Sequence, residues 1–384
     1  MTQFILKFFI ATAVLFSISA NAQDKSAPPL PSACSDDAVK FCSDKKAPRD
    51  VAKCLLSRAA ELNPQCKQEI ERYIQMMSGA EERGGGALTS FGGSNAMGPP
   101  IPLITYSGRV MPGEGEKNPS YSEHKVDFSV PVYKGEGYTI GSSLAAGQLH
   151  LGETVKLDNG RELPTDLHRY EVGAQYFSQL SDKRMLTVRA SAGYAGDKPS
   201  VANKDASYSI NLTYGKPASG NGYWIYALYM SNNSPFINFF PIPGVIYMYR
   251  TPTFTGLFGL PVLSLQWTPE ELWSYSFSLF VTNVQSEIAY GQRNQFQTFL
   301  HYSFNQQSYI LHQREQDRDR LTLQDQKLAA GFRSVLMKKM QLEFQAGRSF
   351  DRTLYIGKGF MNKDRGSATI DADWFGSLGI KVAF

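Results

Sequence analysis

Strict alternation of apolar and polar residues dominates the chain from residue 103 onward. Successive side chains of a β-strand point to opposite faces, so a period of two predicts strands with one apolar and one polar face. In residues 169–176, for example, Tyr170 and Val172 alternate with Arg169 and Glu171. The same alternation recurs in residues 126–132, 186–193, 207–214, 273–281 and 295–304.

The alternating segments predict fourteen antiparallel strands. Twelve strands is the alternative count, if residues 244–268 form one bent element. Even-numbered connections such as 134–137 are short and most odd-numbered ones such as 152–167 are long, with 268–271 as a short exception. This asymmetry is typical of a transmembrane, up-and-down β-barrel, which we expect over residues 103–384. The strands are expected to begin near residues 103, 123, 138, 168, 184, 206, 222, 244, 256, 272, 294, 321, 340 and 374.

Composition agrees with a mainly β membrane protein. Aromatic residues make up 12% of the chain and charged residues 19%, whereas a soluble domain has about 25% charged residues. Aromatic girdles account for such a bias. The net charge of +4 is too small to indicate a nucleic-acid partner, and no glycine-rich loop has the spacing of a phosphate site. The sequence therefore predicts no nucleic-acid partner and no cofactor.

The N-terminus has the features of a secretory signal peptide over residues 1–22. Lys7 precedes a short apolar run at 8–18, and Ala20-Asn21-Ala22 is a typical cleavage site. The apolar run is shorter than the ~20 residues of a membrane-spanning helix. Another apolar stretch, 237–249, contains two prolines, which disfavour a membrane-spanning helix. If this chain crosses a membrane, we therefore expect it to do so as a closed β-structure.

A small cysteine-containing domain is predicted at residues 34–77, after a tail at 23–33. The four cysteines allow three pairings, and the nested one would join two helices, at 48–62 and after Asn63-Pro64. Structural zinc is disfavoured, because the spacings between the cysteines differ from those of zinc sites and no histidine lies nearby. A secreted domain of this size depends on such disulfides for stability. The cysteines are Cys34, Cys42, Cys54 and Cys66.

The pattern around these cysteines resembles a known repeat. Phe41-Cys42, Val51, Cys54-Leu55 and Leu62 are similar to the cysteine-rich repeat that occurs in tandem in a Golgi glycoprotein and singly in some bacterial secreted proteins. The resemblance implies a disulfide-held helical module without known chemistry. Residues 78–102, rich in Gly, Ser, Ala and Pro, are expected to form a flexible linker, as a tether or as a segment that folds back into the barrel.

The C-terminal segment resembles the assembly signal of bacterial outer-membrane β-barrels. The alternating run that begins at Trp374 ends on Phe384, and Gly379 and Val382 fit the Gly-x-x-apolar-x-apolar ending, although Leu378 stands where a polar residue is usual. The resemblance implies the barrel-assembly machinery and outer-membrane lipid as partners. In addition, residues 242–249, 259–261 and Trp273 resemble a family of functionally uncharacterised bacterial outer-membrane barrels.

One constellation raises the question of catalysis. His301, Ser303 and Glu315 are similar to the His-x-Ser…Glu arrangement of outer-membrane lipid A 3-O-deacylases. Those enzymes act at the outer barrel surface, whereas alternation places His301 and Ser303 on the inner face. We therefore expect a polar lining rather than an enzyme, with no catalytic residue and no metal site.

Charged residues on the predicted inner face are candidates for a pore lining. They would form either a weakly anion-preferring pore or salt bridges that close a narrow lumen. We expect a channel or transport component of the outer membrane whose cysteine-rich domain lies in the periplasm and can bind a protein there. The alternatives are a membrane anchor for an interaction domain and, third, a lipid hydrolase. The candidate lining residues are Lys125, Asp127, Arg169, Glu171, Arg189, Lys327, Arg333 and Glu343.

Overall fold

The computed structural model describes residues 32–70, except 44, 46, 47, 60 and 68, and residues 98–384, except 116, 199–202, 235–239, 282, 338, 360 and 361. The chain divides into two compact units, Met1–Arg83 and Gly84–Phe384. Among the described residues, no helix combines the length and apolarity needed to cross a membrane. The predicted signal peptide and most of the predicted linker lie outside the described residues.

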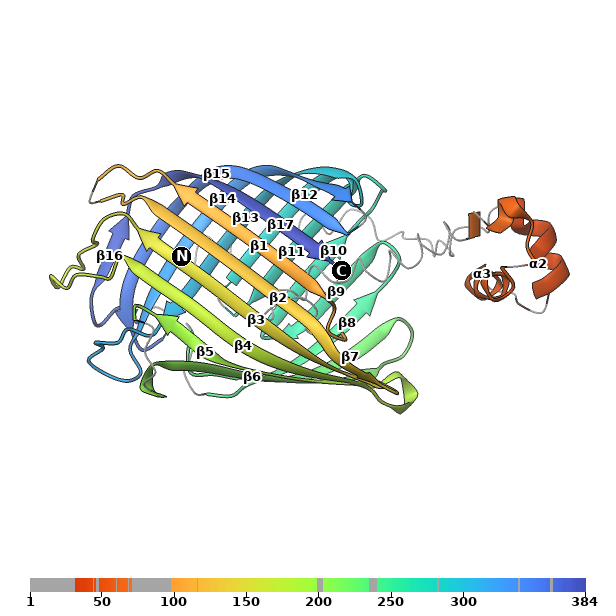
Figure 1. The fold of residues 1–384 in the computed structure, drawn as a ribbon, viewed down its shortest axis with the longest axis horizontal. Helices are drawn as coiled ribbons and strands as arrows, with labels where there is room; N and C mark the ends of the chain where they lie inside the picture. The colour runs from red at the N-terminus through yellow and green to blue at the C-terminus, as the bar shows by residue number, and fades with distance from the viewer. Residues whose placement is uncertain are drawn as a thin grey trace. The chain divides into compact units, whose positions relative to one another are not determined.

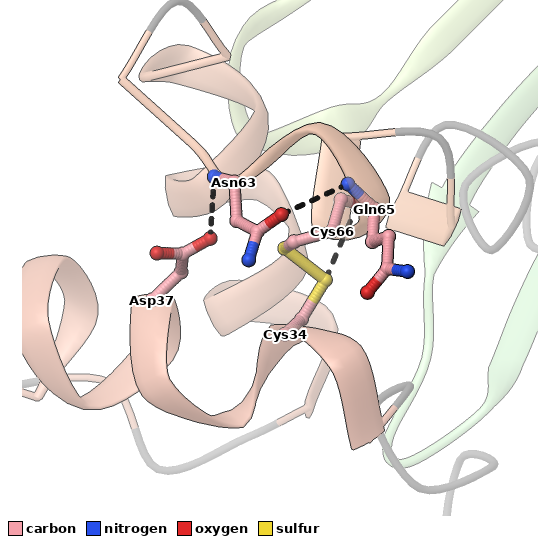
Figure 2. Close-up of a disulfide and its surroundings, with 5 residues drawn as sticks. All are labelled: Cys34, Asp37, Asn63, Gln65 and Cys66. Atoms are coloured by element: carbon pink, nitrogen blue, oxygen red, sulfur yellow. Dashed lines mark hydrogen bonds between the residues drawn. A yellow bond between two sulfur atoms is a disulfide. The ribbon is translucent and has the colours of Figure 1, made fainter.

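The N-terminal unit is helical and contains two disulfides. It comprises η1 (Ser32–Cys34), α2 (Ser35–Cys42), α3 (Pro48–Ser57) and a helical segment within residues 64–70. Cys34 pairs with Cys66 (Figure 2). Cys42 pairs with Cys54, so the two disulfides form the nested arrangement. The cysteines lie in a small buried core of their own, together with Val51, Ala52, Leu55, Leu62 and Ile70.

The helix expected over residues 48–62 is shorter in the structure. It ends at Ser57, whose hydroxyl donates a 2.7 Å hydrogen bond to the carbonyl of Cys54, and the backbone continues in tight turns to Leu62. The next helix begins after Asn63, whose backbone N–H donates to Asp37 while its side chain accepts from the N–H of Gln65 (Figure 2). Both bonds satisfy groups that helix ends leave free.

The C-terminal unit is a closed, antiparallel β-barrel (Figure 1). Sixteen strands form the ring, since each pairs with its neighbour in the chain and β17 closes the ring by pairing with both β15 and β1. The short β16 (Ser367–Ile370) is an extra strand on the end of β15. The strands of the ring are β1 (Leu103–Met111), β2 (Tyr121–Gly135), β3 (Tyr138–Leu151), β4 (Asp166–Gln179), β5 (Met185–Gly196), β6 (Ala206–Pro217), β7 (Gly222–Ser231), β8 (Ile242–Arg250), β9 (Phe254–Leu260), β10 (Val262–Trp267), β11 (Trp273–Phe280), β12 (Asn283–Gln292), β13 (Phe296–Tyr309), β14 (Arg320–Met337), β15 (Met340–Gly357) and β17 (Asp373–Ala383).

The prediction of fourteen strands was wrong, and so was the alternative of twelve. The strands missed are β10 and β12, because neither is preceded by a recognisable turn sequence. Pro261 alone separates β9 from β10 inside one apolar run, and β11 joins β12 through Val281, a β-branched residue at a φ of 51°. Hairpin turns that need positive φ normally carry Gly, Asn or Asp there.

The two missed strands change which connections are exceptions. With β10 included, the short connection at 268–271 becomes even-numbered, as expected, whereas the odd-numbered connections that follow β9 and β11 are short. All even-numbered connections lie at one end of the barrel, which we call the short-turn end. The opposite, long-connection end carries the segments 112–120, 152–165, 197–205, 310–319 and 358–372.

The outer face of the barrel is apolar, whereas charged side chains gather on its inner face. On β4, Tyr170, Val172 and Tyr176 point outward, and Val172 is 59% exposed. Aromatic pairs from adjacent strands form a belt near the short-turn end, with ring centroids 5.0–5.4 Å apart. These pairs are Trp224–Tyr247, Trp273–Tyr290, Phe332–Phe344 and Trp267–Tyr275.

The C-terminal strand completes the ring as the last element. β17 pairs with β1 from Leu103 opposite Ala383 to Val110 opposite Gly376. Phe384 extends beyond it on the outer face, where its ring stacks on Phe128 at 6.1 Å. The C-terminal residue therefore lies at the short-turn end, beside the aromatic belt.

Candidate functional site

The lumen contains a cluster of charged side chains in the half of the barrel nearer the long-connection end. Arg109 of β1 meets Asp325 of β14 at 3.6 Å, although these strands are three places apart in the ring. Only the inner face of a barrel lets side chains from such distant strands meet. We call Arg109, Glu123, Lys125, Asp325 and Lys327 the lumen ion cluster.

Every member of the lumen ion cluster has an opposite charge beside it. Arg109 and Lys125 both bind the carboxylate of Glu123, and Lys327 binds Asp325 at 2.6 Å. Gln307 of β13 reaches across and donates to Glu123 at 3.1 Å. Such pairs offset the cost of removing charges from water. The cluster therefore links β1, β2, β13 and β14 inside the barrel.

Most of the other predicted lining residues also have polar partners. Arg169 binds Glu171 at 2.9 Å, and Arg333 lies between Glu287 and Glu343. Asp127 accepts a 3.4 Å hydrogen bond from Thr105, and Arg189 donates to Gln175 at 2.8 Å. The ion pairs among these contacts are of the kind that the salt-bridged alternative requires, and a lumen closed by them stays a prediction.

Sequence reasoning missed three members of the lumen ion cluster. Arg109, Glu123 and Asp325 all lie in the cluster but were absent from the predicted lining. The available signal was the alternation itself, since Glu123 shares its strand face with Lys125 and Arg109 shares its face with the inward-pointing Thr105.

The last part of the predicted linker lies against the inner wall. Gln175 donates a 2.8 Å hydrogen bond to the carbonyl of Gly98, and Ser129 donates to the carbonyl of Ile101 at 2.8 Å. A Cβ on Gly141 would collide with Pro100. Residues 98–101 thus enter β1 from the lumen, along β2, β3 and β4.

A hydrophobic core lies inside the barrel at its long-connection end, against β1–β5, β13–β15 and β17. Val155, Leu157 and Leu163 of the β3–β4 connection are buried against inward-pointing residues of the wall, as are Leu311 and Ile370. The wall contributes Met111, Tyr121, Leu149, Leu151, Leu167, Leu321, Leu323, Leu354, Ile356 and Phe375 to this core. Connections and wall residues therefore pack together into a plug above the lumen ion cluster.

The β13–β14 connection also crosses the barrel to the opposite wall. β5 and β13 are eight places apart in the ring of sixteen, yet Ile310 forms a parallel bridge with Gly196 at the end of β5. Arg314 donates to Asp205 at 2.6 Å, and His312 contacts the other carboxylate oxygen at 2.8 Å. We call Asp205, His312 and Arg314 the mouth latch.

The mouth latch is expected to withstand mild acid. Burial alone would raise the pKa of Asp205, but hydrogen bonds from Arg314 and His312 lower this pKa below its ordinary value of 3.8. A lowered pKa stabilises the folded state above the ordinary value, and this stabilisation is lost as the pH falls through the folded-state pKa. Conductance of the reconstituted protein should therefore show no opening attributable to Asp205 between about pH 8 and 5, and should rise only below about pH 4. Latch opening at pH 5 that Asp205→Asn abolishes would contradict this prediction.

The catalytic arrangement considered from the sequence is not assembled. His301 and Ser303 both point inward from β13, where they lie opposite Glu287 and Gln285 of β12. Glu315 belongs to the β13–β14 connection and pairs with Arg365 at 2.8 Å. Eight residues of strand, about 26 Å, separate His301 from Tyr309 at the end of β13. Within the described residues, no group of three or more His, Cys, Asp or Glu side chains is placed to hold a metal ion.

Comparisons with known proteins find similar folds but no family. No family model matches the chain, and no curated protein matches it, so the resemblance to the Golgi repeat stays a prediction. Among solved structures, an outer membrane channel from Pseudomonas putida F1 is 10% identical, with 75% of this chain and 96% of that chain covered and a TM-score of 0.33. The Pseudomonas putida toluene transporter TodX is 8% identical, with 79% and 92% covered and a TM-score of 0.32. A mutant of the Rh. blastica porin is 10% identical, with 74% and 99% covered and a TM-score of 0.34. At these identities and scores, function must be argued from the geometry of the barrel itself.

Proposed function

We propose that this protein is an outer-membrane channel whose lumen is narrowed by ion pairs and whose long-connection end is closed by the plug and the mouth latch. The observation that carries the proposal is the polarity of the closed barrel. Its outer face exposes large apolar side chains such as Val172, while its inner face carries the lumen ion cluster. A soluble barrel would hide these apolar residues, whereas lipid solvates them.

The aromatic belt and the connections support an orientation. Aromatic side chains concentrate at membrane–water interfaces, and outer-membrane barrels have their short turns in the periplasm. Phe384 lies at this same end, as the assembly signal predicted from Gly379, Val382 and Phe384 requires. The proposal therefore places the short-turn end in the periplasm and includes recognition by the barrel-assembly machinery.

Planar-bilayer recording of the refolded protein tests the channel. The intact protein should give small, infrequent openings rather than a large steady current, because plug and latch fill the long-connection end. Ion selectivity should be weak, since the charges of the lumen ion cluster are paired. A folded, inserted barrel that never conducts, even after the latch is disrupted, would overturn the proposal.

A second function is favoured by the compact fold of the N-terminal unit. Its described cysteines and apolar residues form a core of their own. We infer that the unit can act as a periplasmic interaction domain on a barrel anchor. Crosslinking in cells that carry the full chain or a chain without residues 23–100 tests this role. Identical crosslinked partners in both strains would exclude it, whatever the conductance.

A further inference from the structure

One sector of the barrel wall is lower than the rest. β9 and β10 have 7 and 6 residues, whereas β2 and β14 have 15 and 18. A tilted strand needs about 9–11 residues to cross the hydrocarbon core of a membrane. The tip of the β9–β10 hairpin is also apolar, because Leu260 beside Pro261 is 80% exposed. With the orientation proposed above, on which this inference rests, the wall ends here inside the outer leaflet.

Above these short strands, the end of β7 meets the edge of β13. Residues 305–309 of β13 pair with β14 on one side, while the ladder with β12 stops at Phe304. Asn233, just after β7, donates a 3.0 Å hydrogen bond to the carbonyl of Ser308, and Asn283 of β12 accepts one of 2.9 Å from the N–H of Gln306. We call these contacts between Asn233, Asn283 and residues 305–309 the seam.

The seam is weaker than a strand ladder. Along this edge of β13, side chains of Asn233 and Asn283 replace backbone partners, and the described residues form few hydrogen bonds there. Among the described residues, buried polar atoms without a hydrogen-bond partner include Oδ1 of Asn233, Oε1 of Gln306 and Oγ of Ser308. Buried polar groups left unpaired cost stability. The barrel therefore separates more easily at the seam than between regular strands.

The inner wall below the seam is apolar, in contrast to the lumen ion cluster. Ile225, Ile246, Leu257 and Val262 form a buried cluster on β7–β10, and Met248 and Phe280 pack against it. Tyr229 of β7 contacts Phe280 of β11 edge-on, at 6.5 Å between ring centroids, although four strand spacings amount to about 19 Å along the wall. The inner side of the low sector is thus packed with apolar side chains from β7 to β11, below the seam.

We propose that the seam is a lateral portal through which small, uncharged apolar molecules pass between the outer leaflet and the lumen. The low rim brings the portal to the depth of the lipid chains, and the unpaired polar atoms make the seam separable. Once the seam separates, the apolar cluster supplies the side chains that a solute would contact. The charged residues of the lumen ion cluster lie on other strands, so a charged solute meets no counter-charge from the apolar cluster.

A crosslink across the seam tests the portal in the full chain. Asn233→Cys with Ser308→Cys, joined after assembly by a short thiol-specific crosslinker, should hold the seam closed. The matched control is Ser191→Cys with Ser209→Cys, whose hydroxyls lie 2.7 Å apart between the regular strands β5 and β6. The probe is N-phenyl-1-naphthylamine, whose fluorescence reports its entry into cells with a lipopolysaccharide-bearing outer membrane. Conductance and the folded-barrel gel shift of the same variants are measured in parallel.

The expected result is a loss of at least about tenfold in the probe's entry rate for the crosslinked seam, with conductance and gel shift unchanged. The β5–β6 crosslink should alter neither the probe's entry rate nor the conductance. Equal probe entry with and without the seam crosslink would overturn the portal, as would probe entry that does not depend on the protein at all. If the protein does not conduct but probe entry still depends on the open seam, the proposed ion channel would be refuted and the portal would be supported.

Discussion

Replacing Asp205 by alanine is expected to convert the small, infrequent openings of the channel into frequent large ones. Asp205 is 1% exposed, and it holds both Arg314 and His312 of a connection that comes from the opposite wall. Its loss leaves the Arg314 guanidinium, itself 5% exposed, without its buried carboxylate. Removing one partner of a buried ion pair costs about 3–5 kcal/mol.

This cost falls on the closed state alone if the latch separates when the channel opens. At about 1.4 kcal/mol for each tenfold change, the ratio of closed to open channels should fall by roughly two to three orders of magnitude. Mean current in a planar bilayer should then rise more than about tenfold. The remaining contacts of the crossing segment, including the bridge between Ile310 and Gly196, limit how far it moves.

Glu315→Ala is the matched control for the latch. Glu315 lies in the same connection and also forms an ion pair, with Arg365, but it is 57% exposed. An exposed pair contributes about 0–1 kcal/mol, so the conductance of this variant should stay within about fivefold of that of the unchanged protein. Asp205→Ala with a normal folded-barrel gel shift and an unchanged current would show that the latch does not close the channel.

Sequence alternation is a strong predictor of the barrel because it reports a local property of each strand. β4 and β17 could be predicted closely, since their side chains alternate and recognisable connections flank them. β10 and β12 could not, because a single proline and the positive-φ residue Val281 make turns that short-range propensity does not anticipate. Local pattern therefore determines which residues face inward more reliably than how many strands there are.

For the lumen ion cluster, the sequence predicted some of the individual residues but not their contacts. Lys125 and Lys327 could be placed on the inner face, but their meeting with Arg109, Glu123 and Asp325 depends on the curvature and register of the whole ring. The latch joins Asp205 to residues 107 and 109 positions later in the chain. No periodicity relates such distant positions, so contacts across the lumen become visible only when the barrel is closed.

The N-terminal unit is expected to unfold when Cys34 and Cys66 are both replaced by alanine, while the barrel stays folded. This disulfide closes a loop of 32 residues, and in the chain-entropy account such a link stabilises by about 4 kcal/mol. The unit has only a small core, and a module of this size retains little stability without its links. Limited proteolysis of the full chain should therefore cleave residues 34–70 of the variant rapidly in native buffer, with the barrel fragment intact.

Cys42→Ala with Cys54→Ala is the matched comparison, because this pair closes a loop of only 12 residues within the same core. Loss of this disulfide is expected to lower the free energy of unfolding by about 3 kcal/mol. Cleavage should therefore be slower than for the Cys34/Cys66 variant at every urea concentration.

The hydrogen bond between Asn63 and Asp37 joins the same two segments as the Cys34–Cys66 disulfide (Figure 2). It cannot replace the disulfide, because one exposed hydrogen bond contributes only about 1 kcal/mol. Equal protease resistance of the Cys34/Cys66 variant and the unchanged protein would mean that the apolar core alone holds the unit together. Faster cleavage of the Cys42/Cys54 variant would instead place the critical constraint between α2 and α3.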